Sequence, residues 1–254
     1  GIWCGLEGAA YNFLLIFLSL KKIRHLPHYV VNLFTRLHRP KHTQTNSIHR
    51  RLQTMTNGKW LIGCEESGRV RDALRAVGVD AWSCDLLPCT ENPSKYHIQD
   101  DLLKVIKSEK WEAIIAFPPC THLAISGSKY FAEKRKSGVQ QEAIKFVESI
   151  WDADCPKIAI ENPVGILSTQ SKLGKATQYI QPYWFGEKQR KKTGLWLKGF
   201  PKLIPTDMID ISKVSEKELN KLYLLAPSPT RALERSKTFH GVANAMASQW
   251  GGLV

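Results

Sequence analysis

The sequence predicts an α/β protein with a mostly parallel sheet and helices on both faces of that sheet. Short apolar runs alternate along the chain with longer segments whose apolar residues recur at helical spacing. Polar or proline-containing turns follow the apolar runs, as they do at the carboxyl ends of buried strands. Because strands that alternate with helices pair in parallel through right-handed crossovers, this order favours such a sheet.

The first half of the predicted sheet ends at residue 117. We expect strands at 60–63, 81–84 and 113–117, with helices at 67–77 and 102–106 between them. Asp85 ends the second strand, and Asp101 directly precedes the second helix. Acidic side chains are therefore expected beside the carboxyl ends of the strands.

The second half begins with a long helix at 139–151, whose apolar residues lie on one side. Ser215 and Glu218 form a capping box that opens a short helix. The remaining expected elements are strands at 157–160, 177–185 and 193–197 and a final helix at 242–250.

Composition indicates one main domain with a basic extension. The 254 residues are 43% hydrophobic, which is enough for a full core, and the net charge is +13. Residues 1–54 carry eight Lys or Arg against one Glu, which gives +7 and leaves +6 for the remainder. This charge favours a polyanionic partner.

Residues 1–54 differ from the rest, and we predict a basic extension there and a catalytic domain at 55–254. The apolar run at 13–18 is shorter than the roughly 20 residues of a membrane span, and we expect no membrane partner. Met55, the first methionine, directly precedes the first predicted strand. A membrane-surface or nucleic-acid-binding arm is the alternative for residues 1–54.

The six cysteines are scattered along the chain. They form no C-x-x-C pair and have no histidine at zinc spacing. We therefore expect neither a disulfide framework nor a metal site, and a reducing compartment.

Cys120 is the candidate nucleophile. It follows the apolar run 113–117 and the two prolines Pro118 and Pro119, which lack amide donors and hold the loop in a stiff turn. A cysteine after a strand is often only a small buried hydrophobe. The second apolar run, 157–160, ends in Glu161, so two strand ends are expected to present a thiol and an acid in one crevice.

The junction at 63–68 is the candidate cofactor loop. Its glycines let the backbone approach a ligand, and the helix that follows favours negative charge, although a plain tight turn explains them equally well. Asp85 stands where doubly wound folds bind a ribose diol, and Asp101 is available to an adenine amino group. Both acids are about as well explained as helix caps.

Together and in this order, these segments resemble the DNA cytosine-5 methyltransferase family. Residues 119–127, Pro-Cys-Thr-His-Leu-Ala-Ile-Ser-Gly, are similar to its Pro-Cys-Gln loop, and Glu161-Asn162-Pro163 is similar to its Glu-Asn-Val. Residues 239–247 are similar to its closing Gly-Asn-Ala-Val segment. The resemblance covers roughly residues 60–250 and is closest to small phage and bacterial members.

The resemblance implies a Rossmann-like, S-adenosylmethionine-dependent methyltransferase fold acting on DNA, double- or single-stranded, in the cytoplasm of a bacterial or phage-infected cell. Cys120 would attack carbon 6 of cytosine, Glu161 would bond to ring nitrogen N3, and Asn162 would orient the base or brace the loop. The implied S-adenosylmethionine contacts are Gly63, Glu65, Ser67, Gly68, Asp85, Asp101, Pro118 and Asn244. The implied nucleic-acid contacts are Ser126, Arg190 and Lys192, with Lys191 as a further phosphate candidate.

The chain departs from the family pattern in several places. Two glycines of the cofactor loop are replaced, Thr121 stands where glutamine is usual, and Pro163 stands where valine is. Only 46 residues separate Thr193 from His240, where the family inserts a large target-recognition domain. The substrate is therefore left open between DNA, RNA and a pyrimidine nucleotide, and a non-catalytic nucleic-acid-binding module is a further alternative. The oligomeric state is not predicted.

Overall fold

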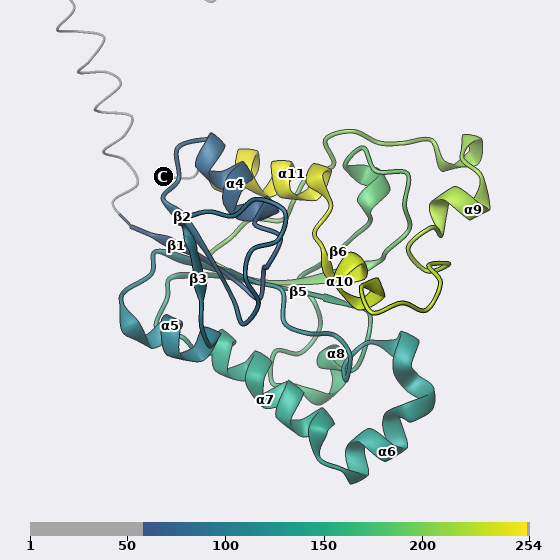
Figure 1. Ribbon diagram of the computed structural model, residues 1–254, viewed down its shortest axis with the longest axis horizontal. Helices are drawn as coiled ribbons and strands as arrows, with labels where there is room; N and C mark the ends of the chain where they lie inside the picture. The colour runs from purple at the N-terminus through teal and green to yellow at the C-terminus, as the bar shows by residue number, and fades with distance from the viewer. Residues whose placement is uncertain (1–57, 253–254) are drawn as a thin grey trace, which may run out of the picture. The chain divides into compact units, whose positions relative to one another are not determined.

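Seven strands form one sheet at the centre of the protein (Figure 1). The computed structural model describes residues 58–252 of the chain, so the extension predicted at 1–54 lies outside the described residues. In sheet order the strands are β3 (His97–Gln99), β2 (Ala81–Asp85), β1 (Trp60–Gly63), β4 (Ala113–Ala116), β5 (Lys157–Pro163), β7 (Thr193–Lys198) and β6 (Gln178–Ile180). The first five are parallel, and β7 runs antiparallel to both β5 and β6. The expected mostly parallel α/β architecture is confirmed.

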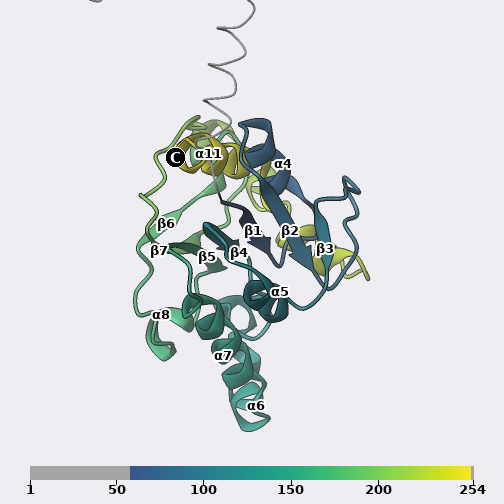
Figure 2. The ribbon, with the colours of Figure 1, turned by 90° about the vertical axis from the view of Figure 1, so that its left-hand side faces the viewer.

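Helices cover both faces of the sheet, as Figure 2 shows. One face packs against α4 (Arg69–Ala76) and α11 (His240–Trp250), and the other packs against α5 (Leu102–Ser108) and α7 (Val139–Trp151). The shorter elements are η1 (Ile125–Tyr130), α6 (Phe131–Lys136), α8 (Leu167–Gln170), η2 (Pro182–Trp184), η3 (Ile211–Lys213), α9 (Glu216–Leu219) and α10 (Arg231–Ser236). In Figures 1 and 2, α6 projects away from the sheet beyond the end of α7. None of the described helices is long and apolar enough to cross a membrane.

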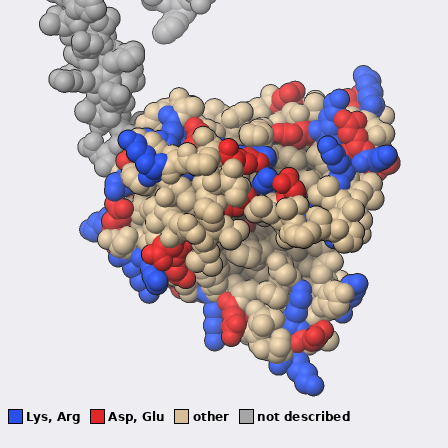
Figure 3. Space-filling model, viewed as in Figure 1, with Lys and Arg blue, Asp and Glu red and all other residues tan. Residues whose placement is uncertain are grey.

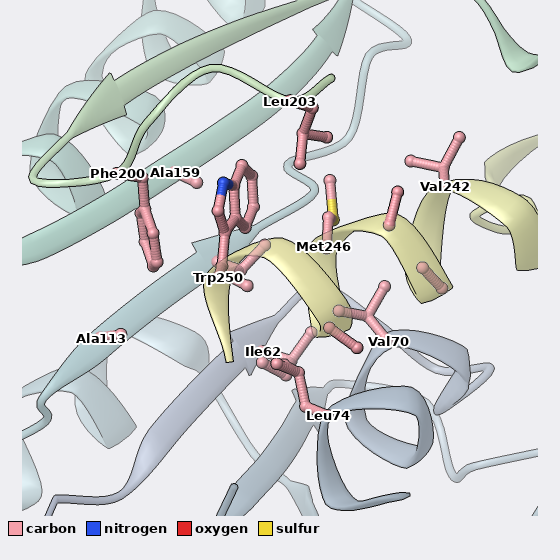
Figure 4. Packing of buried hydrophobic residues seen from close by; sticks show 14 of the residues in the cluster. Ile62, Val70, Leu74, Ala113, Ala159, Phe200, Leu203, Val242, Met246 and Trp250 are labelled. Carbon is pink, nitrogen blue, oxygen red and sulfur yellow. The ribbon is translucent and has the colours of Figure 1, made fainter. Parts of the chain in front are cut away.

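Alternate residues of each central strand enter two separate cores. In β1, Ile62 packs toward α4 and α11, whereas Leu61 packs toward α5 and α7. Figure 4 shows the first core, in which Leu74 of α4 lies near Ile62 of β1 and Met246 of α11 points toward Leu203. Burial on both faces explains why β1 and β4 are continuous apolar runs rather than alternating ones.

Two strand predictions are wrong in their bounds. We expected the strand at 157–160 to end before Glu161, but β5 continues to Pro163 because these residues pair with β7. The strand expected at 177–185 is only β6, because Pro182 has no amide to donate and begins a 3-10 turn. The predicted capping box is confirmed, since the Ser215 hydroxyl accepts from the amide of Glu218 at 3.2 Å.

Candidate active site

The Cys120 loop, residues 118–127, leaves the sheet at the carboxyl end of β4. Pro118 and Pro119 have no amide hydrogen and cannot continue strand pairing. The Cys120 carbonyl accepts from the amides of Leu123 and Ala124 at 3.0 and 2.9 Å. This tight turn holds Cys120, which is partly buried, next to the end of the strand.

A backbone contact joins the Cys120 loop to the chain after β5. Ala124 and Gly165 form an antiparallel bridge, and the amide of Ile166 donates to the Leu123 carbonyl at 3.0 Å. A Cβ atom on Gly165 would lie 2.0 Å from that carbonyl oxygen. Glycine is therefore required for the two loops to approach this closely.

Asn162 braces the same loop from β5. Its side chain is fully buried, and its Nδ2 donates to the Pro118 carbonyl at 2.9 Å. Its Oδ1 is buried without a hydrogen-bond partner among the described residues. Of the two roles expected for Asn162, this contact supports the bracing of the loop.

Lys191, which we expected only as a phosphate contact, lies at the candidate site. The Lys191 charge and the Thr193 side chain both act to lower the pKa of the Glu161 carboxyl. The Lys191 ammonium also donates to the carbonyl of Arg235 at 3.1 Å. The signal in the sequence is the spacing of two between Lys191 and Thr193, because alternate residues entering a strand share one face.

The pKa values of Cys120 and Glu161 are both raised. Burial, followed by the charge of Glu161, raises the pKa of the Cys120 thiol, while Lys191 and Arg235 lower it by less. Burial also raises the pKa of the Glu161 carboxyl, against the opposing effects of Lys191 and Thr193. The thiol is therefore protonated near neutral pH, and Glu161 holds its proton more tightly than an exposed glutamate does.

A cavity of about 20 Å³ lies beside Glu161 and Lys191. Phe117, Thr238 and Phe239 form part of its lining. This volume holds about one water molecule. A pyrimidine ring therefore enters only if residues that line the cavity move.

Residues 236–239 are tied to the start of α4. Arg69 donates from Nη1 to the Thr238 carbonyl at 2.9 Å, and its Nε lies 2.6 Å from the Glu91 carboxylate. Lys237 lies 3.1 Å from the same carboxylate. Hydrogen bonds from Arg69 and then Lys237 lower the pKa of Glu91 to about 2. These charged side chains thus join residues that line the cavity to α4, the helix that follows the predicted cofactor loop.

The predicted cofactor loop, Gly63–Gly68, lies between β1 and α4. Gly68 has a φ of 73°, in the left-handed region that favours glycine. The Glu65 carboxylate points inward and accepts from two amides in the first turn of α4, at 2.5 and 3.3 Å. Burial raises the pKa of Glu65 to about 8. Glu65 and Ser67 are both buried, so in this structure they support the loop from within.

Asp85 and Asp101 lie near this loop. Both contribute, after burial, to the raised pKa of the Cys64 thiol. Asp85 accepts from the amide of Leu87 at 3.0 Å, and Asp101 caps α5 by accepting from the amide of Lys104 at 3.1 Å. The cap interpretation is thus confirmed for Asp101, while each carboxylate keeps a second oxygen that can accept from a ligand.

The other predicted contacts lie in different surroundings. Pro118 is buried under Asn162, and Asn244 is exposed on α11. Ser126 is exposed in η1, Arg190 forms an ion pair with Glu216 at 2.6 Å, and the Lys192 ammonium lies 4.9 Å from the centre of the Tyr179 ring. Arg190 and Lys192 are therefore partly engaged within the protein.

Comparison with known proteins adds no relative to this description, since neither a protein-family model nor a curated protein matches the chain.

Proposed function

We propose that the protein transfers a methyl group from S-adenosylmethionine to carbon 5 of cytosine in DNA, through a covalent adduct on Cys120. The observation that carries this proposal is the contact between the loop of Cys120 and the strand of Glu161, in which Asn162 Nδ2 donates to the Pro118 carbonyl at 2.9 Å. The charge of Glu161 also raises the pKa of the Cys120 thiol. The two side chains come from the carboxyl ends of the adjacent parallel strands β4 and β5. A thiol and an acid at neighbouring strand ends are the pair that this reaction requires.

The chemistry follows from the two residue types. Carbon 5 of cytosine is a poor nucleophile, and a bond from the Cys120 sulfur to carbon 6 turns the ring into a reactive enamine. As that bond forms, electrons move toward N3, and Glu161 gives its proton to N3. A carboxyl whose pKa is raised by burial suits this step because it holds its proton to a higher pH than an exposed glutamate does. Cys120 reacts as the thiolate, so its thiol proton first passes to water. Carbon 5 takes the methyl group as the bond between the methyl group and the sulfonium sulfur breaks, and the proton on carbon 5 then passes to water. The Cys120 sulfur departs from carbon 6 as a thiolate, and N3 returns its proton to Glu161.

Lys191 favours the attack of the Cys120 sulfur on carbon 6 of cytosine. The negative charge of Glu161 raises the pKa of Cys120, whereas Lys191 and Arg235 lower it. When Glu161 is neutral, the repulsion between the carboxylate and a thiolate is absent and the attraction from the two cations remains. A protonated Glu161 and a Cys120 thiolate therefore support each other in one site.

The surroundings of the 63–68 loop suit S-adenosylmethionine, which supplies a methyl group on positively charged sulfur when it is bound. Asp85 would accept from the ribose hydroxyls and Asp101 from the adenine amino group. Leu86 and Leu87, directly after Asp85, are 70% and 50% exposed. They offer an apolar surface of the kind that packs against a flat adenine ring.

A non-catalytic binding module is the second candidate function. The raised pKa of Cys120 favours it, because catalytic cysteines in substrate-free enzymes usually have lowered pKa values. The small cavity beside Glu161 also favours a binding module, because a pyrimidine ring does not fit in it. Methyl transfer to RNA or to a pyrimidine nucleotide uses the same residues and differs only in the substrate.

Covalent trapping separates these functions. DNA that contains 5-fluorocytosine, offered with S-adenosylmethionine as a single strand and as a duplex, should form an adduct that survives denaturing electrophoresis. Fluorine at carbon 5 cannot leave as a proton, so Cys120 stays bound. Cys120→Ser should abolish the adduct, and Glu161→Gln should slow its formation because glutamine has no acidic proton to give N3.

Cys155→Ser is the matched control. Cys155 is buried and donates to the carbonyls of Trp111 and Lys157 at 3.3 and 3.2 Å, so it is remote from this chemistry. Trapping by Cys120→Ser at the wild-type rate contradicts the catalytic proposal. The binding module replaces it if cofactor binds and no adduct forms on DNA, RNA or nucleotide.

A further inference from the structure

We propose that η1 and α6 form a binding surface for single-stranded DNA beside the Cys120 loop. The surface consists of Ile125, Lys129, Tyr130, Lys134, Arg135 and Lys136, and we call it the α6 surface. The choice of DNA as the strand rests on the proposed function. The α6 surface has exposed apolar side chains, a net positive charge and a position next to the Cys120 loop.

Two large apolar side chains are exposed on this surface. Ile125 is 60% exposed and Tyr130 is 49% exposed. The ammonium groups of Lys129 and Lys134 lie 4.7 and 5.9 Å from the centre of the Tyr130 ring. An exposed aromatic ring flanked by cations is the arrangement on which proteins stack bases and hold the neighbouring phosphates.

The charge of the α6 surface is uncompensated. Between residues 129 and 136, four Lys or Arg face one acid, Glu133, which gives a net charge of +3. Within the described residues 58–252, none of these four cations forms an ion pair, whereas Arg69, Lys157, Arg190 and Lys237 all do. Unpaired cations are available to phosphates at no cost in broken ion pairs.

The position of the surface fits a strand that delivers a base to Cys120. η1 begins five residues after Cys120, and the Lys134 ammonium donates to the Thr121 carbonyl at 2.5 Å. Figure 3 shows the molecule hollowed between the region of α10 and the projecting end formed by α6, which carries basic side chains. A strand bound on α6 therefore runs along the entrance to the candidate site.

The exposed Tyr130 ring favours single-stranded over duplex DNA. In a duplex both faces of each base are already stacked, so Tyr130 finds a free face only on an unpaired base. The described residues between Thr193 and His240 form short elements, of which α9 and α10 have four and six residues, rather than a large recognition domain. The α6 surface therefore favours a strand that is already open.

The test is a binding titration of the full chain, without cofactor, against a short fluorescent single strand containing cytosine and against its duplex. Wild type should bind the single strand more tightly. Tyr130→Ala should weaken single-strand binding by at least about fivefold, the loss expected for one stacked base, and should change duplex binding little. The combined change of Lys129→Glu and Lys136→Glu should lower the slope of log affinity against log salt by about 1.4, for two lost phosphate contacts.

Matched controls come from other parts of the surface. Tyr223 is 68% exposed, and Tyr223→Ala should leave binding unchanged. Lys107→Glu with Lys110→Glu makes the same charge change at exposed lysines on and after α5, which form no ion pair with any residue in the described range 58–252. Equal losses in the control and α6 variants overturn the proposal, as does tighter binding of the duplex by wild type. Equal displacement of DNA by polyglutamate also overturns it, in favour of an acidic protein partner.

The same proteins distinguish failure of this inference from failure of the proposed function. If wild type traps 5-fluorocytosine DNA and the α6 variants bind as wild type does, methyl transfer stands and the α6 surface is wrong. If wild type never traps DNA but loses single-strand binding on Tyr130→Ala, the surface stands and the catalytic proposal is wrong.

Discussion

Gly165 lies so close to Leu123 that a Cβ atom on the glycine would be 2.0 Å from the Leu123 carbonyl oxygen. Both groups belong to the backbone and cannot rotate away as a side chain does. The contact therefore sets the separation between the Cys120 loop and the end of β5, which carries Glu161.

Gly165→Ala should push the two loops apart. We expect a loss of about 1–3 kcal/mol in the free energy of unfolding, measured by urea denaturation, because the overlap is with a backbone atom. The rate of covalent trapping should fall further than this loss of stability explains. Gly252→Ala is the control, since a Cβ there would make only an ordinary contact with a described atom, the Ser248 carbonyl oxygen at 3.6 Å. A Gly165→Ala protein with wild-type stability and trapping contradicts the claim that this contact positions Cys120.

Lys191→Met should raise the pKa of the Cys120 thiol, because Lys191 is one of the two cations that lower it. The pH dependence of alkylation by iodoacetamide, followed by mass spectrometry of the Cys120 peptide, should then shift to higher pH. Lys192→Met is the neighbouring control, since Lys192 is exposed above the Tyr179 ring. The assignment of Lys191 to the site fails if both variants titrate like wild type.

Asp85→Ala should weaken S-adenosylmethionine binding, measured by titration calorimetry, by about 10- to 100-fold. This is the loss expected for one hydrogen bond to a charged acceptor. Asp154→Ala removes an exposed carboxylate after α7 and should bind as wild type does. The cofactor assignment is abandoned if wild type itself binds no S-adenosylmethionine.

Glu65 should make the protein less stable as pH rises. Its pKa is raised from 4.5 to about 8 in the folded protein, so between these values the folded chain holds a proton that the unfolded chain has released. The free energy of unfolding therefore falls across this window, by an amount on the order of a few kcal/mol, and the loss is complete above about pH 8.

Glu65→Gln should flatten that fall, because glutamine keeps the neutral shape and never ionises. Urea denaturation at several pH values measures the slope, and near pH 4.5 the variant should be close to wild type in stability. Glu161→Gln should flatten the slope as well, because the pKa of Glu161 is also raised by burial. A wild-type stability that rises steadily through this window contradicts the buried, protonated Glu65.

Local sequence patterns were sufficient to predict the central strands and the candidate site residues near the strand ends. The apolar runs of β1 and β4 can be recognised because both strands are buried on both faces, and a turn follows each run. In β5 the apolar run stops at Ile160, before the strand itself ends at Pro163. Parallel neighbours then bring Cys120 and Glu161 together, since their strands end at the same edge of the sheet.

The tertiary structure decided the features that depend on distant partners. Asn162 braces the Cys120 loop because β5 lies beside β4, and Lys191 enters the site because β7 pairs antiparallel with β5. Spacing along the chain carries local preferences, but strand direction and the burial of a charge are set by groups far away in the sequence. For the same reason, only the fold reveals that Gly165 must be a glycine, because the carbonyl it meets lies 42 residues earlier, at Leu123.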